Sequence, residues 1–175
     1  LDHVDPLAFH GIHTRQLLGW TVRPGGCREV ARRLQREGRV RFVGFSTHAT
    51  TDIILAAIDT GEFDYVNLHW YFVNELNTAA LEAARRHDMG VLIISPNDKG
   101  GRLQDRPALM AGLCAPLSPM QFNALFCFAR PDLHTLSLRV AKPEDFDEHL
   151  ASLPQLDRAA GLVAPIEVKL RARLR

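Results

Sequence analysis

Short apolar segments that end in polar residues recur along this chain. Four of them begin with aliphatic or aromatic residues and finish in histidine, serine, asparagine or aspartate: Val4–His10, Phe42–His48, Tyr65–His69 and Val91–Asp98. Nearly continuous apolar runs are typical of parallel strands that are buried on both faces. α/β enzymes place their chemistry where such strands end, so the polar ends are the first candidates for a site.

Helical segments separate these strands. Val30, Ala31 and Leu34 recur at helical spacing and predict a helix from Cys27, with Gly38 as its C-cap. Similar patterns predict four more helices: Thr51–Thr60, Thr78–His87, Pro119–Ala129 and Glu144–Leu153. We expect a loop around Trp20, a long loop after residue 97, and the start of a helix with a basic face over 168–175.

The alternation of elements predicts the fold class. The expected strands, separated by about one helix each, are Val4–His10, Val40–Phe45, Tyr65–His69, Val91–Ser95 and Thr135–Val140. This order is typical of βαβ units. A complete (β/α)8 barrel takes about 250 residues, whereas this chain has 175. The pattern therefore predicts either an open doubly wound sheet or the later part of a barrel, in a single domain over residues 1–175.

Composition narrows the functional classes. Hydrophobic residues make up 46% and charged residues 23%, and the formal net charge is +1. These values favour a globular protein without a nucleic-acid or membrane-surface partner, and no segment is apolar enough to span a bilayer. The cysteines Cys27, Cys114 and Cys127 are odd in number and widely spaced, which predicts reduced thiols and a cytoplasmic protein. Because the chain opens with Leu1 on a strand approach, we expect a fragment that lacks N-terminal strands.

Histidines near the predicted strand ends suggest one chemistry. His10, His13, His48 and His69 could converge on zinc in a barrel hydrolase, with Asp98 as a carboxylate ligand. The alternative, which we favour because no His-x-His pair lies on one strand, is that each histidine is a hydrogen-bonded strand-end residue and that no metal is bound.

Small polar residues suggest a second chemistry. Backbone amides of Lys99-Gly100-Gly101 could approach a pyrophosphate, although an ordinary loop has the same composition. Ser46, Thr47 and Asn67 carry hydroxyl and amide groups suited to a carboxamide, although each is equally typical of a strand end.

Taken in order, several segments resemble the aldo/keto reductase family. The resemblance is to bacterial oxidoreductases with a Phe-His-Gly sequence, and it rests on these segments: Phe9–Gly11, Val43–Thr47, Val66–Tyr71, Ile94–Gly101, Leu117–Leu125 and Pro143–Phe146. It implies a TIM barrel of which this chain supplies strands four to eight. It also implies hydride transfer between a nicotinamide cofactor, NADP(H) or NAD(H), and a small carbonyl or alcohol substrate.

The resemblance also implies residue roles. His10 matches the family's catalytic histidine, whereas Tyr65, Tyr71 and Lys99 do not match its tyrosine and lysine. The implied cofactor-binding residues are Ser46, Thr47, Asn67, Ser95, Pro96, Asn97, Arg139 and Lys142. Thr47 stands in place of an asparagine, and Asn67 in place of a glutamine.

Several residues depart from the family pattern. Ile94 stands where many family members have an aromatic residue, and Arg139 stands where many have a glycine. Asp145 stands where an arginine often holds the 2′-phosphate of NADP, which weakens the expectation of an NADP preference unless Arg139 and Lys142 compensate.

The resulting expectation is an aldo/keto reductase-type oxidoreductase that is inactive as this segment alone. The alternatives are the metal-dependent hydrolase and a non-catalytic binding module. Trp20 and Trp70 are candidates for a pocket wall, and we expect self-association through exposed sheet edges.

Overall fold

The computed structural model describes residues 2–97, 103–105, 108–140 and 142–173. The chain divides into two compact units, and each is described by itself below. Unit 1 contains residues 1–68 and 76–92, and unit 2 contains residues 69–75 and 93–175. The expectation of a single domain stays a prediction.

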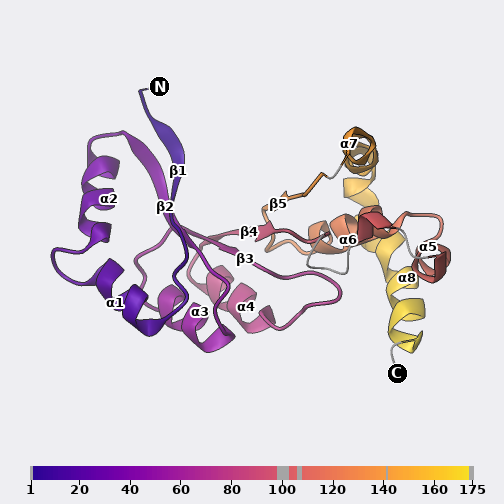
Figure 1. Cartoon of the computed structure of the whole chain (residues 1–175), viewed down its shortest axis with the longest axis horizontal. Coiled ribbons are helices and arrows are strands. Elements are labelled where there is room, and N and C mark those ends of the chain that lie inside the picture. The colour runs from indigo at the N-terminus through magenta and orange to yellow at the C-terminus, as the bar shows by residue number, and fades with distance from the viewer. Residues whose placement is uncertain (1, 98–102, 106–107, 141, 174–175) are drawn as a thin grey trace. The chain divides into compact units, whose positions relative to one another are not determined.

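The described strands form one sheet in the order of the sequence, β1-β2-β3-β4-β5, and Figure 1 labels each of them. They are β1 (Val4–Phe9), β2 (Val40–Ser46), β3 (Tyr65–Leu68), β4 (Gly90–Ile94) and β5 (Thr135–Ser137). A doubly wound sheet reverses its strand order at a switch point, whereas a barrel adds each strand beside the previous one. The sequential order therefore confirms the partial (β/α)8 barrel, and the doubly wound alternative is wrong.

Unit 1 carries the first strands of this sheet and four helices. The helices are α1 (Arg15–Val22), α2 (Cys27–Arg36), α3 (Thr51–Ile58) and α4 (Thr78–Arg86). Strands β1, β2 and β3 pair in parallel, and α2 covers them through a cluster of Ala31, Val40 and Val43. Gly44 lets β2 approach β3 closely, because a Cβ at this position would lie 2.5 Å from the Tyr65 ring.

The expected loop around Trp20 is wrong, because α1 occupies that segment. The hydroxyl of Thr14 accepts a hydrogen bond from the Leu17 backbone N–H at 3.1 Å and caps the helix. Trp20 lies on its outer face and is half exposed.

Unit 2 is mostly helical. After the 3-10 turn η1 (Leu103–Asp105) it contains α5 (Ala108–Cys114), α6 (Pro119–Phe128), α7 (Pro143–Leu150), the 3-10 helix η2 (Leu153–Arg158) and α8 (Ala159–Arg173). Helix α6 begins at a capping box, in which the Ser118 hydroxyl and the Gln121 side chain bond each other's backbone N–H groups. The prediction missed α5. It also placed the last helix too late, because Gly161 and Pro165 lie inside α8 and both disfavour helix interiors.

An aromatic cluster forms part of the core of unit 2. The rings of Trp70 and Phe126 stack at 5.1 Å and 10°, and Phe72 meets Phe122 and Phe126 edge-on. The helix α6 residues Phe122, Leu125 and Phe126 are buried, as their helical spacing predicted. None of the described helices combines the length and apolar character that a membrane span requires.

All three cysteines are free thiols. Cys27 is exposed at the start of α2 in unit 1, whereas Cys114 and Cys127 are buried in unit 2. Burial raises the pKa of Cys114 to about 11 and that of Cys127 to about 12.

Candidate functional site

The carboxyl ends of β1, β2 and β3 bring three predicted site residues into one row. Phe9 is the register partner of Phe45, so His10 follows β1 beside Ser46. Ser46 is in turn the register partner of Asn67. In-register residues of neighbouring strands project from the same face, so this row gathers an imidazole, a hydroxyl and a carboxamide within unit 1.

Ser46 fixes the turn that carries His10. Its hydroxyl accepts a hydrogen bond from the Gly11 backbone N–H at 3.1 Å and lies 3.0 Å from His10 Nδ1. Its carbonyl accepts hydrogen bonds from the N–H groups of Gly11 and Ile12 at 3.1 and 3.0 Å. Gly11 has a φ of 78°, a conformation that glycine adopts without strain. The imidazole is therefore held by one serine through backbone and side chain together.

Thr47 bonds backbone groups at two neighbouring strand ends. Its hydroxyl donates to the Ile12 carbonyl at 2.7 Å and accepts from the Ala49 N–H at 3.0 Å. Its backbone N–H donates to the Asn67 carbonyl at 3.0 Å, and the residue is buried. Its hydroxyl is thus engaged by both neighbours, and the expected role of Thr47 in cofactor binding stays a prediction.

Asn67 presents a buried acceptor. Its Oδ1 has no hydrogen-bond partner among the described residues. A buried polar atom without a partner costs about 1–3 kcal/mol, so this oxygen is a natural place for a ligand N–H donor.

The histidines proposed as zinc ligands are used differently. His13 Nδ1 accepts the backbone N–H of His48 at 3.1 Å, and the two rings lie 5.4 Å apart. His69 belongs to unit 2, and Asp98 lies outside the described residues. Within the described part of the chain, no three histidine, cysteine, aspartate or glutamate side chains are grouped to hold a metal ion.

The remaining predicted cofactor residues lie in unit 2, after β4 and β5. Ser95 has a φ of 52° and its N–H bonds the Ser137 carbonyl at 3.2 Å. Asn123 on α6 donates to the Pro96 carbonyl at 3.1 Å, which ties the loop to the core. Lys99, Gly100 and Gly101, the predicted pyrophosphate loop, lie outside the described residues.

A buried histidine that the prediction missed lies beside this loop. His149 Nε2 is 3.2 Å from Asn97 Nδ2 and 3.3 Å from the Arg139 carbonyl oxygen. Asn97 Oδ1 and His149 Nδ1 are buried without a partner among the described residues. The only sequence signal for His149 was its position one helical turn after Asp145. Its Nε2 can accept from the Asn97 amide or donate to the Arg139 carbonyl, depending on the tautomer, so His149 lies beside two predicted cofactor residues.

Asp145 and Lys142 form the start of α7. Asp145 Oδ2 accepts the Lys142 backbone N–H at 3.3 Å, and the carboxylate is almost fully buried. Acidic groups are favoured in the first turn of a helix by the orientation of its peptide dipoles. Asp145 therefore has a structural reason to be an aspartate.

Tyr65 is poorly suited to donate a proton. Tyr65 and Tyr71 are both buried, and burial, together with the neighbouring Asp64 carboxylate, raises the pKa of Tyr65. A catalytic acid works best with a pKa near the working pH, so Tyr65 is a poor donor.

Comparison with known proteins gives similarity in structure but not in sequence. No protein-family profile matches the chain, and no curated protein matches it. The aldo-keto reductase AKR11C1 from Bacillus halodurans matches in its holo form with a TM-score of 0.70, 14% identity, and coverage of 92% of this chain and 59% of that chain. Its apo form matches with a TM-score of 0.68 over 92% and 62% of the two chains, again at 14% identity.

A second solved structure agrees. An aldose reductase from Giardia lamblia matches with a TM-score of 0.65 and 14% identity, over 95% of this chain and 62% of that chain. The chain thus spans about three fifths of the solved structures that it matches. Together with the sequential strand order, these similarities show that the chain has the aldo-keto reductase fold over the part of the barrel that it spans.

Proposed function

We propose that this chain is the cofactor-binding part of a nicotinamide-dependent oxidoreductase of the aldo-keto reductase type. Its substrate class is a small carbonyl compound or the corresponding alcohol. The observation that carries the proposal is the row of His10, Ser46 and Asn67 at the carboxyl ends of three parallel strands, with Asn67 Oδ1 buried and unpartnered among the described residues. When bound, a nicotinamide dinucleotide supplies or accepts the hydride.

The residues present fit a carboxamide at this row. A carboxamide offers an N–H donor, which is what the unpartnered Asn67 oxygen lacks. Ser46 is occupied by Gly11 and His10, so we assign it to positioning His10 rather than to the cofactor. Thr47 joins the strand ends, and His10 orients the substrate oxygen.

The other predicted cofactor residues lie in unit 2 and are considered there by themselves. Ser95, Pro96 and Asn97 form a loop start held by Asn123, and Arg139 and Lys142 bring two cationic side chains. We propose that this group contacts the phosphates.

The first experiment tests the carboxamide contact. Asn67→Leu removes the oxygen at similar side-chain volume, and we expect it to weaken NADH binding to the full chain by about tenfold. The 3-acetylpyridine analogue lacks the amino group of the carboxamide, so its affinity should be the same for the variant and the wild type. Equal losses for both dinucleotides, measured by fluorescence titration, would contradict the contact.

A second experiment tests turnover. Hydride transfer to a carbonyl needs a proton donor, and neither Tyr65 nor Tyr71 matches the family's catalytic tyrosine. We therefore expect dinucleotide binding without appreciable NADPH oxidation over a panel of aldehydes. Robust turnover that is lost in His10→Ala would contradict the expected lack of activity and would indicate that another residue donates the proton.

The choice of dinucleotide is a third point. Because the Asp145 carboxylate stands at the start of α7, we propose only a weak preference for NADP over NAD. Titration of both dinucleotides tests this. A large NADP preference that disappears in Arg139→Ala or Lys142→Ala would show that these cations decide the choice.

A further inference from the structure

Unit 2 contains an apolar pocket beside α8. Its volume is about 230 Å³, and its walls come from α5, α8 and the loop after β3. A water molecule occupies about 30 Å³ of liquid, and a methylene group is of similar size, so the pocket has room for a chain of about seven such groups. This volume suits the hydrocarbon part of a small amphiphile. The apolar side chains that line the pocket are Phe72, Val73, Leu109, Met110, Leu113 and Leu170.

The pocket has a buried end and an exposed rim. Phe72 and Leu170 are almost fully buried. Leu109 and Val73, in contrast, are exposed at 62% and 51%. Removal of apolar surface from water is favourable, so a hydrocarbon chain in the pocket would be stabilised by covering the rim residues as well as by filling the interior.

One cationic side chain stands at this pocket. Among the described lining residues, Arg173 is the one that carries a charge. The described walls expose no polar surface, so the hydrocarbon stem of Arg173 forms the wall while its guanidinium extends into solvent. Arginine side chains commonly lie along apolar surface in this way. Within the described part of the chain Arg173 makes no hydrogen bond or ion pair, so its guanidinium is available to an anion at the rim.

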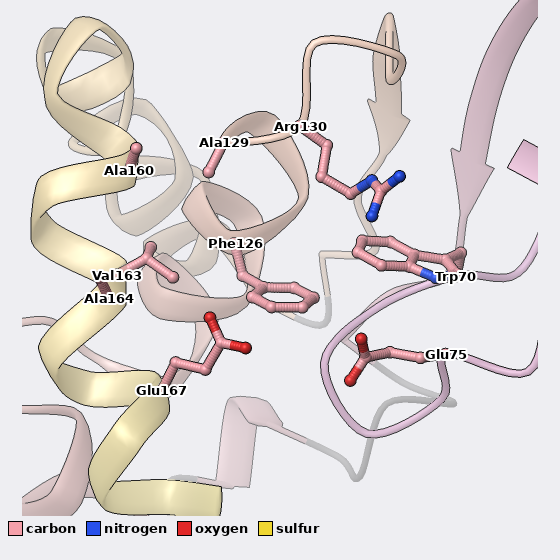
Figure 2. A pocket seen from close by; sticks show the side chains of 9 residues that line it. All are labelled: Trp70, Glu75, Phe126, Ala129, Arg130, Ala160, Val163, Ala164 and Glu167. Carbon is pink, nitrogen blue, oxygen red and sulfur yellow. The ribbon is translucent and has the colours of Figure 1, made fainter. Parts of the chain in front are cut away.

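The preceding arginine of α8 is engaged instead. Arg171 donates to Glu75 at 2.6 Å and to Glu167 at 2.8 Å, two carboxylates that line a different pocket (Figure 2). Its guanidinium also lies 5.1 Å from the centre of the Phe72 ring. Arg171 therefore supports the aromatic wall, and Arg173 is the cation that a ligand of the apolar pocket would meet.

We propose that this pocket binds a medium-chain carboxylate, whose hydrocarbon tail occupies the apolar interior and whose carboxylate pairs with Arg173 at the rim. A guanidinium presents two parallel N–H donors in the geometry that a carboxylate accepts. An ammonium head group would meet the like charge of Arg173, and an alcohol would leave that charge without a counter-ion. The assignment is independent of dinucleotide binding, because no described residue assigned to the cofactor lines the pocket.

The test follows the methyl group of Met110 by NMR in the full chain. The methionines are Met89, Met110 and Met120, of which Met110 lines the pocket and the other two are buried outside it. With ¹³C in the methionine methyl groups, octanoate should shift the Met110 signal saturably and leave the others unchanged, and Met110→Leu assigns the signal. Octanol and octylammonium at the same ionic strength should bind about three- to fivefold more weakly. Equal binding of all three would overturn the carboxylate contact, and absence of a saturable shift below the micelle concentration of octanoate would overturn the site.

Chain length separates the pocket from general adsorption. Hexanoate should bind about tenfold more weakly than octanoate, because it buries two methylene groups fewer. Dodecanoate exceeds the interior and should gain little over octanoate. A steady gain up to dodecanoate would indicate that a surfactant adsorbs to apolar surface, and it would overturn the pocket. A Met110 signal that shifts with protein concentration alone would assign the rim to a second copy of the chain and would likewise overturn the proposal.

Two variants locate the binding. Arg173→Met removes the charge, keeps a long side chain, and should weaken octanoate binding by about three- to fivefold without changing octanol binding. Lys169→Met removes the same charge from an exposed position of α8 that does not line the pocket, and it should change neither. Leu113→Trp fills the interior and should abolish binding. Unchanged octanoate affinity in Arg173→Met, or full binding in Leu113→Trp, would overturn the proposal. Far-UV circular dichroism checks that each variant is folded, and the exposed Arg173 position decides if Leu113→Trp is not.

Discussion

At the scale of single residues, Ser46 decides the chemistry that His10 can offer. Its hydroxyl oxygen accepts from the Gly11 N–H, and we expect the hydroxyl proton to be donated to His10 Nδ1, 3.0 Å away. An imidazole that accepts at Nδ1 carries its proton on Nε2 when neutral. His10 would then present an N–H donor to a substrate oxygen, which is what orienting a carbonyl requires.

The first prediction follows from this hydrogen bond. In Ser46→Ala the neutral His10 ring should lose its preference for the Nε2–H tautomer, and the free energy of unfolding should fall by about 1 kcal/mol. Two-dimensional ¹⁵N–¹H NMR of the imidazole nitrogens reads the tautomer directly. Ser46→Thr keeps a hydroxyl and serves as the matched control. An Nδ1–H tautomer in the wild-type chain would contradict the prediction.

The residue scale also shows how far the site could be predicted. Strand-end positions alone placed His10, Ser46 and Asn67 together, because parallel strands end at one edge. The partners of Thr47 could not be predicted, since the Ile12 carbonyl is 35 residues away and a carbonyl has no sequence signature. His149 was missed for the same reason, because long-range packing places it beside Asn97, 52 residues away.

At the scale of elements, close approach between β2 and β3 depends on Gly44. A Cβ there would meet the Tyr65 ring and its carbonyl oxygen at 2.5 Å. Gly161, in contrast, lies inside α8, where a Cβ would have no atom within 4 Å beyond its own stretch of helix. Gly44 is therefore required by the packing of β2 against β3, whereas Gly161 only lowers the stability of α8.

The second prediction uses this contrast. Gly44→Ala should lower the free energy of unfolding by about 1–3 kcal/mol through overpacking, and Gly161→Ala should raise it by about 1 kcal/mol through helix propensity. Urea denaturation followed by circular dichroism measures both. Equal effects of the two substitutions would mean that β2 and β3 can separate to admit a methyl group.

Helices and strands were predictable where apolar residues recur at regular spacing. They were not predictable where glycine or proline interrupts the segment. Helix α2 was found because its apolar residues recur at helical spacing before Gly38. Helix α8 was predicted to start late because Gly161 and Pro165 interrupt it, although burial of Val163, Ile166 and Leu170 holds the helix together. The short strand β5 ends at Ser137 rather than at Val140.

At the scale of the whole molecule, β1 is an edge of the sheet among the described strands. Apolar side chains near this edge are exposed, with Val4 at 42% and Phe42 of β2 at 48%. Exposed edge strands pair readily with other chains unless charge or proline prevents it, and β1 contains Asp5 and Pro6. We therefore expect this edge to mediate self-association through its exposed apolar side chains rather than through pairing of its backbone.

The third prediction tests that edge. Val4→Lys should shift the chain from dimers or larger species toward the monomer in size-exclusion chromatography with light scattering at several concentrations. Gln16→Lys adds the same charge at an exposed position of α1 and controls for net charge. A wild-type chain that is monomeric at every concentration would contradict the expectation.

The distribution of thiols makes each unit chemically distinguishable. With Cys27 exposed in unit 1 and Cys114 and Cys127 buried in unit 2, a disulfide reagent near neutral pH should modify one thiol at once and two slowly. The slow pair reacts only when its surroundings open, because the thiolate is the nucleophile and burial suppresses it. In Cys27→Ser, only Cys114 and Cys127 remain, so their labelling rate measures how fast unit 2 opens. Rapid labelling of all three thiols would contradict the prediction, because it would mean that unit 2 opens faster than the reagent reacts.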